Sequence, residues 1–64
     1  MNQLMITVYD IEKAGHNCSL LAEVDKQSNV VKIYDYNGNE LEMHMFRDEV
    51  YFNRRWWSFQ RKQN

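Results

Sequence analysis

Residues 50–59 have the sequence VYFNRRWWSF, and the conformation of this stretch decides the fold class of the chain. Half of its residues are aromatic, and aromatic side chains are enriched in β-strands. Asn53 and Arg54 separate two apolar runs, as the central residues of a hairpin turn do. We therefore predict a C-terminal hairpin. Its inward side chains are expected to be Val50, Phe52, Trp57 and Phe59, and its outward side chains Tyr51, Trp56 and Ser58.

A helix beginning at Asp48 is the alternative for the same stretch. It would carry acids in its first turn and basic residues in its last turn, which suits the helix dipole. Phe52, Trp56 and Phe59 also recur at helical spacing, which would bury Trp56 and expose Trp57. Adjacent side chains diverge by about 180° in a strand and about 100° in a helix, so either structure places one tryptophan in the core.

Upstream, two segments alternate apolar and polar residues, as half-buried strands do. They are LMITVYD, residues 4–10, and CSLLAEVD, residues 18–25. The polar segment between them contains Gly15, and we expect a loop there or a single helical turn opened by Asp10. Within the first segment Leu4, Ile6 and Val8 are expected to share one side, and within the second Cys18, Leu20, Ala22 and Val24 are expected to do the same.

A second hairpin is predicted at YNGN, residues 36–39, because Asn-Gly suits the two positive φ angles of a type I′ turn. This turn would pair Tyr36 with Asn39, Tyr34 with Leu41, Lys32 with Met43 and Val30 with Met45. The loop DKQSN, residues 25–29, would pair Val24 with Val30 and hold Asn29 in the left-handed conformation. The residues that this register adds to the core are Val30, Tyr34, Leu41, Met43 and Met45.

Together these elements predict an all-β fold: a small, strongly bent antiparallel sheet or partly open barrel of about five strands. An antiparallel sheet with one C-terminal helix, an α+β fold, is the alternative. Residues 1–64 are expected to form a single small domain, near the lower size limit for a chain without disulfides.

The composition predicts a cytoplasmic protein. Cys18 is the only cysteine, so no disulfide forms within the chain, and a reducing compartment suits it. No apolar run approaches membrane-spanning length, and the first residues, MNQLMITVYD, lack the pattern of a signal peptide. We expect no membrane association.

The charges are distributed unevenly along the chain. All nine acidic residues fall within residues 1–49, whereas residues 50–64 carry four basic residues and no acid. Basic and aromatic residues are interleaved in this last segment, and Trp, Tyr and Arg are the residues enriched in interface cores. The predicted partner-binding residues are Tyr51, Arg54, Arg55, Trp56, Arg61 and Lys62.

A second candidate surface is acidic. In the predicted register Asp35 lies directly opposite Glu40, which is a destabilising like-charge pair. Such clustering is typical of a surface for a basic partner, and a simply solvated charged face is the alternative. The residues of this predicted acidic surface are Glu23, Asp35, Glu40 and Glu42.

The sequence contains no catalytic, cofactor or metal motif that we recognise. His16, Cys18 and His44 are suitable ligands for zinc, but their spacing matches no paired-ligand pattern. We therefore expect no enzymatic activity, cofactor or metal.

The predicted function is that of a non-catalytic protein-binding module, a phage- or plasmid-type regulator or inhibitor that docks on a larger host protein. Nucleic-acid binding through the basic aromatic end is the alternative. The sequence leaves both a monomer and a homodimer open.

Overall fold

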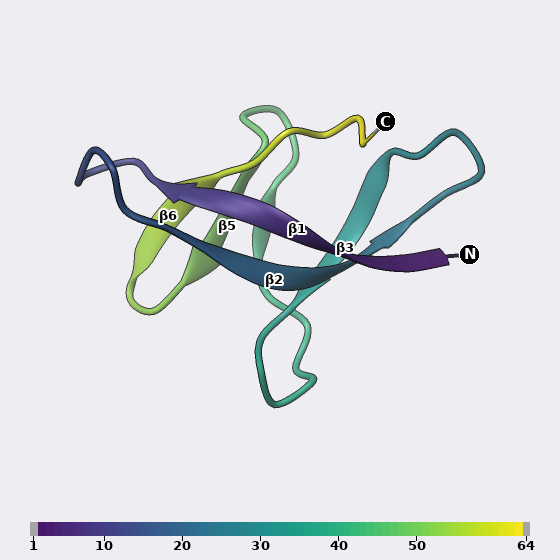
Figure 1. Ribbon diagram of the computed structural model, residues 1–64, viewed down its shortest axis with the longest axis horizontal. Coiled ribbons are helices and arrows are strands. Elements are labelled where there is room, and N and C mark those ends of the chain that lie inside the picture. Colours follow the sequence, from purple (N-terminus) through teal and green to yellow (C-terminus); the bar gives the residue numbers. More distant parts are fainter. Residues whose placement is uncertain (1, 64) are drawn as a thin grey trace.

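The computed structural model describes residues 2–63 and is all-β, as predicted. One antiparallel sheet contains six strands in the spatial order β3-β2-β1-β6-β5-β4 (Figure 1). The strands are β1 (Asn2–Asp10), β2 (Asn17–Val24), β3 (Val30–Tyr34), β4 (Met43–His44), β5 (Glu49–Phe52) and β6 (Arg55–Ser58). No helix occurs in the described residues, so the alternative of a C-terminal helix is wrong.

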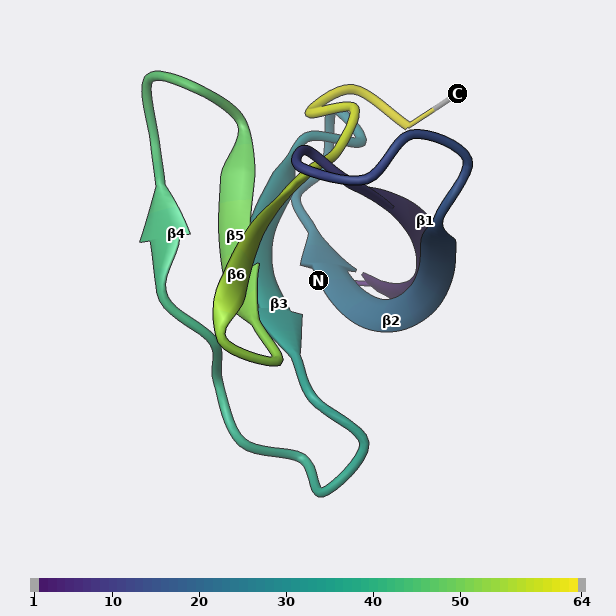
Figure 2. The same cartoon turned by 90° about the vertical axis from the view of Figure 1, so that its left-hand side faces the viewer.

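The sheet curls until it is nearly closed into a barrel, as Figure 2 shows. Backbone hydrogen bonds close the seam between β3 and β4. The segment before β4 is hydrogen-bonded to both β3 and β5. Leu41 N–H donates to the Ile33 carbonyl of β3, and the Glu42 carbonyl accepts from Tyr51 N–H of β5, each at 2.8 Å. The chain end closes the barrel beside β3, where Val30 N–H donates to the Arg61 carbonyl at 2.8 Å.

The core lies on the concave face of this sheet. Apolar and polar residues alternate along β1 and β2 as predicted, and every second residue is buried from Ile6 onward in β1 and from Leu20 onward in β2. The buried apolar side chains are Ile6, Val8, Leu20, Ala22, Val24, Val30, Ile33, Val50, Trp57 and Phe59. Every strand except β4 contributes at least one buried apolar residue. Met43 of β4 is partly buried and packs against this cluster.

The C-terminal hairpin formed by β5 and β6 is confirmed. Asn53 and Arg54 have φ angles of 54° and 67°, which are the two positive values that a type I′ turn requires. Val50 therefore pairs with Trp57 on the inside, and Tyr51 pairs with Trp56 on the outside. The Trp57 indole N–H is satisfied inside the fold, because it donates to the Phe52 carbonyl at 2.6 Å.

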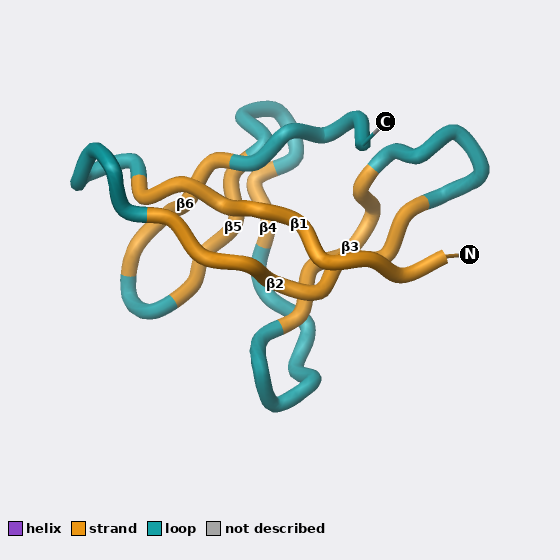
Figure 3. The backbone as a smooth tube through the Cα atoms, in the orientation of Figure 1, coloured by secondary structure: helices purple, strands orange, loops and turns teal. Residues whose placement is uncertain are grey.

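The predicted type I′ turn at YNGN is wrong. Only Gly38 has a positive φ there, and the loop is one of three central residues closed by hydrogen bonds between Asp35 and Asn39. The Asp35 carboxylate accepts the N–H groups of Asn37 and Asn39 at 2.9 Å each, which stabilises the wider loop. Tyr34 consequently bridges to Glu40 rather than Leu41, so the predicted register was off by one residue. Figure 3 shows the connection between β3 and β4 projecting from the sheet.

The loop DKQSN adopts the same structure as DYNGN. The Asp25 carboxylate accepts the N–H groups of Gln27 and Asn29 at 2.9 and 3.0 Å, as Asp35 does in its own loop. Ser28 occupies the left-handed position that Gly38 fills in the other loop, with a φ of 66°. The prediction that Asn29 is left-handed is therefore wrong, whereas the predicted pairing of Val24 with Val30 is confirmed.

A register shift in β2–β3 changes the predicted core. The pairing slips between Glu23 and Val24, so that Ala22 faces Ile33. Such a bulge adds one residue to β3 and turns Ile33 inward in place of the predicted Tyr34. Met45 is also outside the core, because it lies in the exposed loop after β4. Leu41 and Met43 pack against the core as predicted.

The structure predicts that Leu20→Ala destabilises the domain by about 2–4 kcal/mol, because Leu20 is fully buried and its loss leaves a cavity. Chemical denaturation monitored by circular dichroism measures this change. Met5→Ala is the matched control, since Met5 is 56% exposed on the outside of β1 and should change stability little. Equal stabilities for Leu20→Ala and the parent would contradict the core assignment.

The two equivalent loops predict opposite effects of exchanging their left-handed residues. Ser28→Gly should stabilise the domain by up to about 1 kcal/mol, because glycine adopts a positive φ without a steric cost. Gly38→Ser should destabilise it by a similar amount. Thermal unfolding of both variants tests this, and a loss of stability in Ser28→Gly would show that the serine side chain is needed in its loop.

Candidate functional site

Three rings gather on the convex side of β4, β5 and β6, and we call His44, Tyr51 and Trp56 the aromatic face. Trp56 contacts both other rings. Its centroid lies 5.3 Å from that of Tyr51 and 6.3 Å from that of His44, with interplanar angles of 63° and 78°. These edge-to-face arrangements are favourable for aromatic pairs and fix the rings in place on rigid strands.

The aromatic face is accessible and continues onto β1. Tyr51 is 39% exposed, Trp56 is half-buried and His44 is exposed. Tyr9 pairs with Ser58 on the same side of the sheet and is 52% exposed. Ile11 follows β1 and is exposed, and its N–H approaches the Trp56 carbonyl at 3.5 Å. A surface rich in apolar and aromatic groups therefore spans four neighbouring strands.

Two carboxylates share this side of the sheet. Glu49 is the register partner of His44, and Glu42 lies opposite Tyr51, whose N–H donates to the Glu42 carbonyl. The neighbouring cations lie on loops instead: Arg54 is in the β5–β6 turn, and Arg47 is in the loop between β4 and β5. The strands thus present rings and acids, with the arginines beyond their ends.

The loop between β4 and β5 is held by Arg61. Its guanidinium donates to Asp48 Oδ1 at 2.7 Å and also to the Met45 carbonyl. Asp48 has a positive φ of 53°, so the ion pair restrains a strained backbone. Phe46, at the tip of this loop, is 96% exposed.

Arg55 has a structural role on the opposite side of the sheet from Trp56. It donates to Asp10 Oδ2 at 2.6 Å, and the Asp10 side chain is only 2% exposed. Asp10 also accepts the N–H groups of Glu12 and Lys13, which begins the loop after β1. Burial raises the pKa of Asp10, but these hydrogen bonds and the Arg55 charge outweigh it and leave the pKa below the ordinary value.

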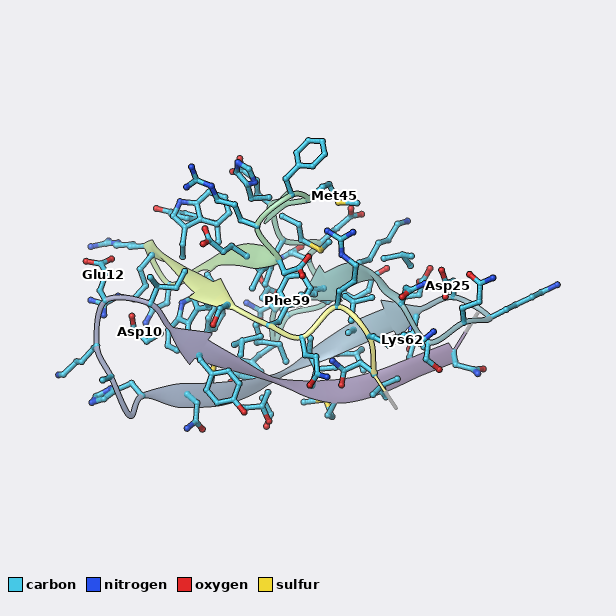
Figure 4. All side chains as sticks on the ribbon, turned by 90° about the horizontal axis from the view of Figure 1, so that it is seen from above. Asp10, Glu12, Asp25, Met45, Phe59 and Lys62 are labelled. Atoms are coloured by element: carbon cyan, nitrogen blue, oxygen red, sulfur yellow. The ribbon has the colours of Figure 1, made fainter. Side chains whose placement is uncertain are left out.

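The structure separates the residues predicted to bind a partner. Tyr51 and Trp56 lie in contact on the aromatic face, and Arg54 is beside them in the turn. Arg55 binds Asp10 and Arg61 binds Asp48. Lys62 lies near Asp25, at the end of the molecule opposite Asp10 (Figure 4).

The four predicted acidic residues are brought together only in part: Glu23 and Glu40 both lie beside Tyr34 and Lys32. Glu23 accepts a hydrogen bond from the Tyr34 hydroxyl at 3.2 Å, and Glu40 is 4.0 Å from the Lys32 ammonium. Asp35 bonds within its own loop, so the prediction that it lies opposite Glu40 is wrong. Glu42 lies on a different part of the surface, beside the aromatic face.

The sequence pattern did not indicate that His44, Tyr9 and Glu49 belong to this surface. Their association depends on the pairing of β4 with β5 and of β1 with β6, which connects residues far apart in the chain. Because Met43 is predicted to face the core, period-two alternation predicts that His44 lies on the opposite, polar side of its strand. The missing information was which strands become neighbours.

The metal-ligand candidates do not come together. Among residues 2–63 no group of three or more His, Cys, Asp or Glu side chains could hold a metal ion, and no pocket is present.

Burial raises the pKa of the Cys18 thiol, while a hydrogen bond with the Tyr36 hydroxyl opposes this effect. The Tyr36 ring also packs edge-on against Phe52, with centroids 5.8 Å apart.

Comparison with known proteins gives no relationship: no family model, curated protein or solved structure matches this chain. Within the described part of the chain, no helix has the length and apolar character needed to cross a membrane.

The buried ion pair predicts a pH-dependent effect of Asp10→Asn. Because the pKa of Asp10 in the fold lies below 3.8, its charge stabilises the domain above that pH, and this stability is lost as the pH falls through the lowered pKa. Asp10→Asn should therefore lower the Tm at neutral pH and differ progressively less from the parent toward about pH 2. Thermal unfolding over this range is the measurement, with Glu40→Gln as an exposed control. A Tm difference that does not vary with pH would contradict the proposed role of the charge.

Proposed function

We propose that this chain is a non-catalytic protein-binding module that docks on a larger protein through the aromatic face. The observation that carries the proposal is the cluster of His44, Tyr51 and Trp56 on the outside of the sheet. The core is already formed by Trp57, Phe59 and aliphatic side chains, so the outer rings are available to a partner. A module of this kind would act as a regulator or inhibitor by occupying a surface of its target, as small phage and plasmid proteins do.

Aromatic residues at such a position suit a binding hot spot. Trp and Tyr bury a large area with few rotatable bonds, so they lose little conformational entropy on binding. Here the strand backbone and the edge-to-face contacts restrict the rings further. The surface is therefore largely preorganised, which lowers the cost of association.

Protein binding is favoured over nucleic-acid binding by the way the arginines are used. Two of the four basic residues of the C-terminal segment form ion pairs with aspartates of the same chain, Arg55 with Asp10 and Arg61 with Asp48. Lys62 is far from Trp56, so Arg54 is the cation of that segment beside the rings. Phosphate binding relies on several neighbouring cations, and Glu42 and Glu49 would repel a nucleic-acid backbone.

The proposal predicts that Tyr51→Ala and Trp56→Ala each weaken partner binding by about 2 kcal/mol or more while the fold is kept. The tagged chain is used to capture proteins from the source cell, and the affinity for the captured protein is then measured by calorimetry. Met5→Ala is the control, because it removes an exposed apolar side chain from a different part of the outer surface. Circular dichroism verifies that each variant is folded.

A partner that binds both aromatic variants as tightly as the parent would contradict the use of the aromatic face. Titration with a single-stranded oligonucleotide tests the other function. Binding that weakens steeply with salt and is lost in Trp56→Ala would replace the proposal with nucleic-acid binding.

A further inference from the structure

The charges beside the aromatic face indicate what kind of group it receives. We propose that it binds a lysine or arginine side chain of the partner protein, with the cation over the rings of Trp56 and Tyr51 and close to Glu42 and Glu49. This inference rests on the proposed function and deepens it by naming the chemistry of the partner.

The rings supply the first part of the site. Trp56 is the best side chain for cation–π attraction, and a cation within about 6 Å of the ring centroid is attracted by its negative face. Tyr51 and His44 meet Trp56 at interplanar angles of 63° and 78°, so neither ring stacks face to face on the indole. The cluster therefore forms an angular surface against which an extended basic side chain can pack.

The carboxylates supply the second part. Within residues 2–63, the side chains of Glu42 and Glu49 make no hydrogen bond or ion pair, unlike Asp10, Asp48 and Glu40. Cross-strand neighbours have Cβ atoms about 5 Å apart, which places Glu49 beside His44 and Glu42 beside Tyr51. Two free negative charges thus adjoin the rings.

Other occupants fit this chemistry less well. A purely apolar partner would desolvate Glu42 and Glu49 without compensating them, which is costly. An acidic partner would meet like charges. A basic side chain satisfies the carboxylates and uses the rings at the same time, and the exposed Arg47 and Arg54 beyond the strand ends can contact acidic groups that flank it in the partner.

The test is an NMR titration of the ¹⁵N-labelled protein with an acetylated tetra-arginine peptide at low salt. The indole N–H resonance of Trp56 should shift, whereas that of Trp57, which is bonded to Phe52 inside the fold, should not. A tetra-citrulline peptide of nearly the same shape but without charge is the control ligand and should cause no shift.

Two charge-matched double variants decide whether the site is specific. Glu42→Gln/Glu49→Gln should weaken peptide binding about three- to tenfold, because it removes the carboxylates beside the rings. Glu23→Gln/Glu40→Gln removes the same charge from β2 and from the segment after β3, beside Tyr34, and should weaken binding less than twofold. Trp56→Leu and Tyr51→Leu should also weaken binding, and Tyr51→Leu alone tests the rings if Trp56→Leu does not fold.

Equal weakening by both double variants would show binding to the overall negative charge and would overturn the inference, as would unchanged binding in Glu42→Gln/Glu49→Gln. A dimer, detected by light scattering, that excludes the peptide would assign the face to a second copy of the chain and would also overturn it. These outcomes are separable from the proposed function. Loss of protein capture in Tyr51→Ala, together with no charge dependence, would keep the protein-binding module and remove only the basic occupant.

Discussion

The register of the β5–β6 hairpin is the constraint on which the rest of the structure depends. Positive φ angles at Asn53 and Arg54 fix a two-residue turn, and this turn sets which residues face each other. Trp57 then fills the core, while Trp56 joins the outer rings. A slip of one residue would exchange the two faces, so that the core would lose its largest side chain and the aromatic face its central ring.

The same register joins the two halves of the barrel. β1, β2 and β3 form one meander and β4, β5 and β6 form another. The short pairing of β1 with β6 joins them into one sheet, and the seam between β3 and β4 brings their other edges together. Asp10 lies opposite Trp57 there, and the hairpin turn brings Arg55 to its carboxylate. Arg55, which the sequence pattern assigned to the binding surface, therefore stabilises the fold instead. The aromatic face that remains carries rings and acidic side chains.

Local sequence rules predicted the all-β class, the C-terminal hairpin and the alternation of β1 and β2, because each depends on neighbouring residues. These rules failed where a side-chain hydrogen bond changes a loop, or where the pairing of strands that are distant in sequence decides which residues are neighbours. The Asp35 carboxylate widened a loop that Asn-Gly alone would have made tighter, and the bulge near Val24 brought Ile33 into the core. At the candidate site, alternation found Tyr51 and Trp56, but His44 joins them only through the pairing of β4 with β5.

Single-tryptophan variants test the central claim, that the hairpin places one tryptophan in the core and the other on the binding surface. Trp56→Phe retains only Trp57, and Trp57→Phe retains only Trp56. Acrylamide quenching of folded Trp56→Phe should be weak and its emission blue-shifted, whereas the indole left in Trp57→Phe should be quenched readily. The opposite pattern, or equal quenching in both variants, would contradict the register and with it the aromatic face.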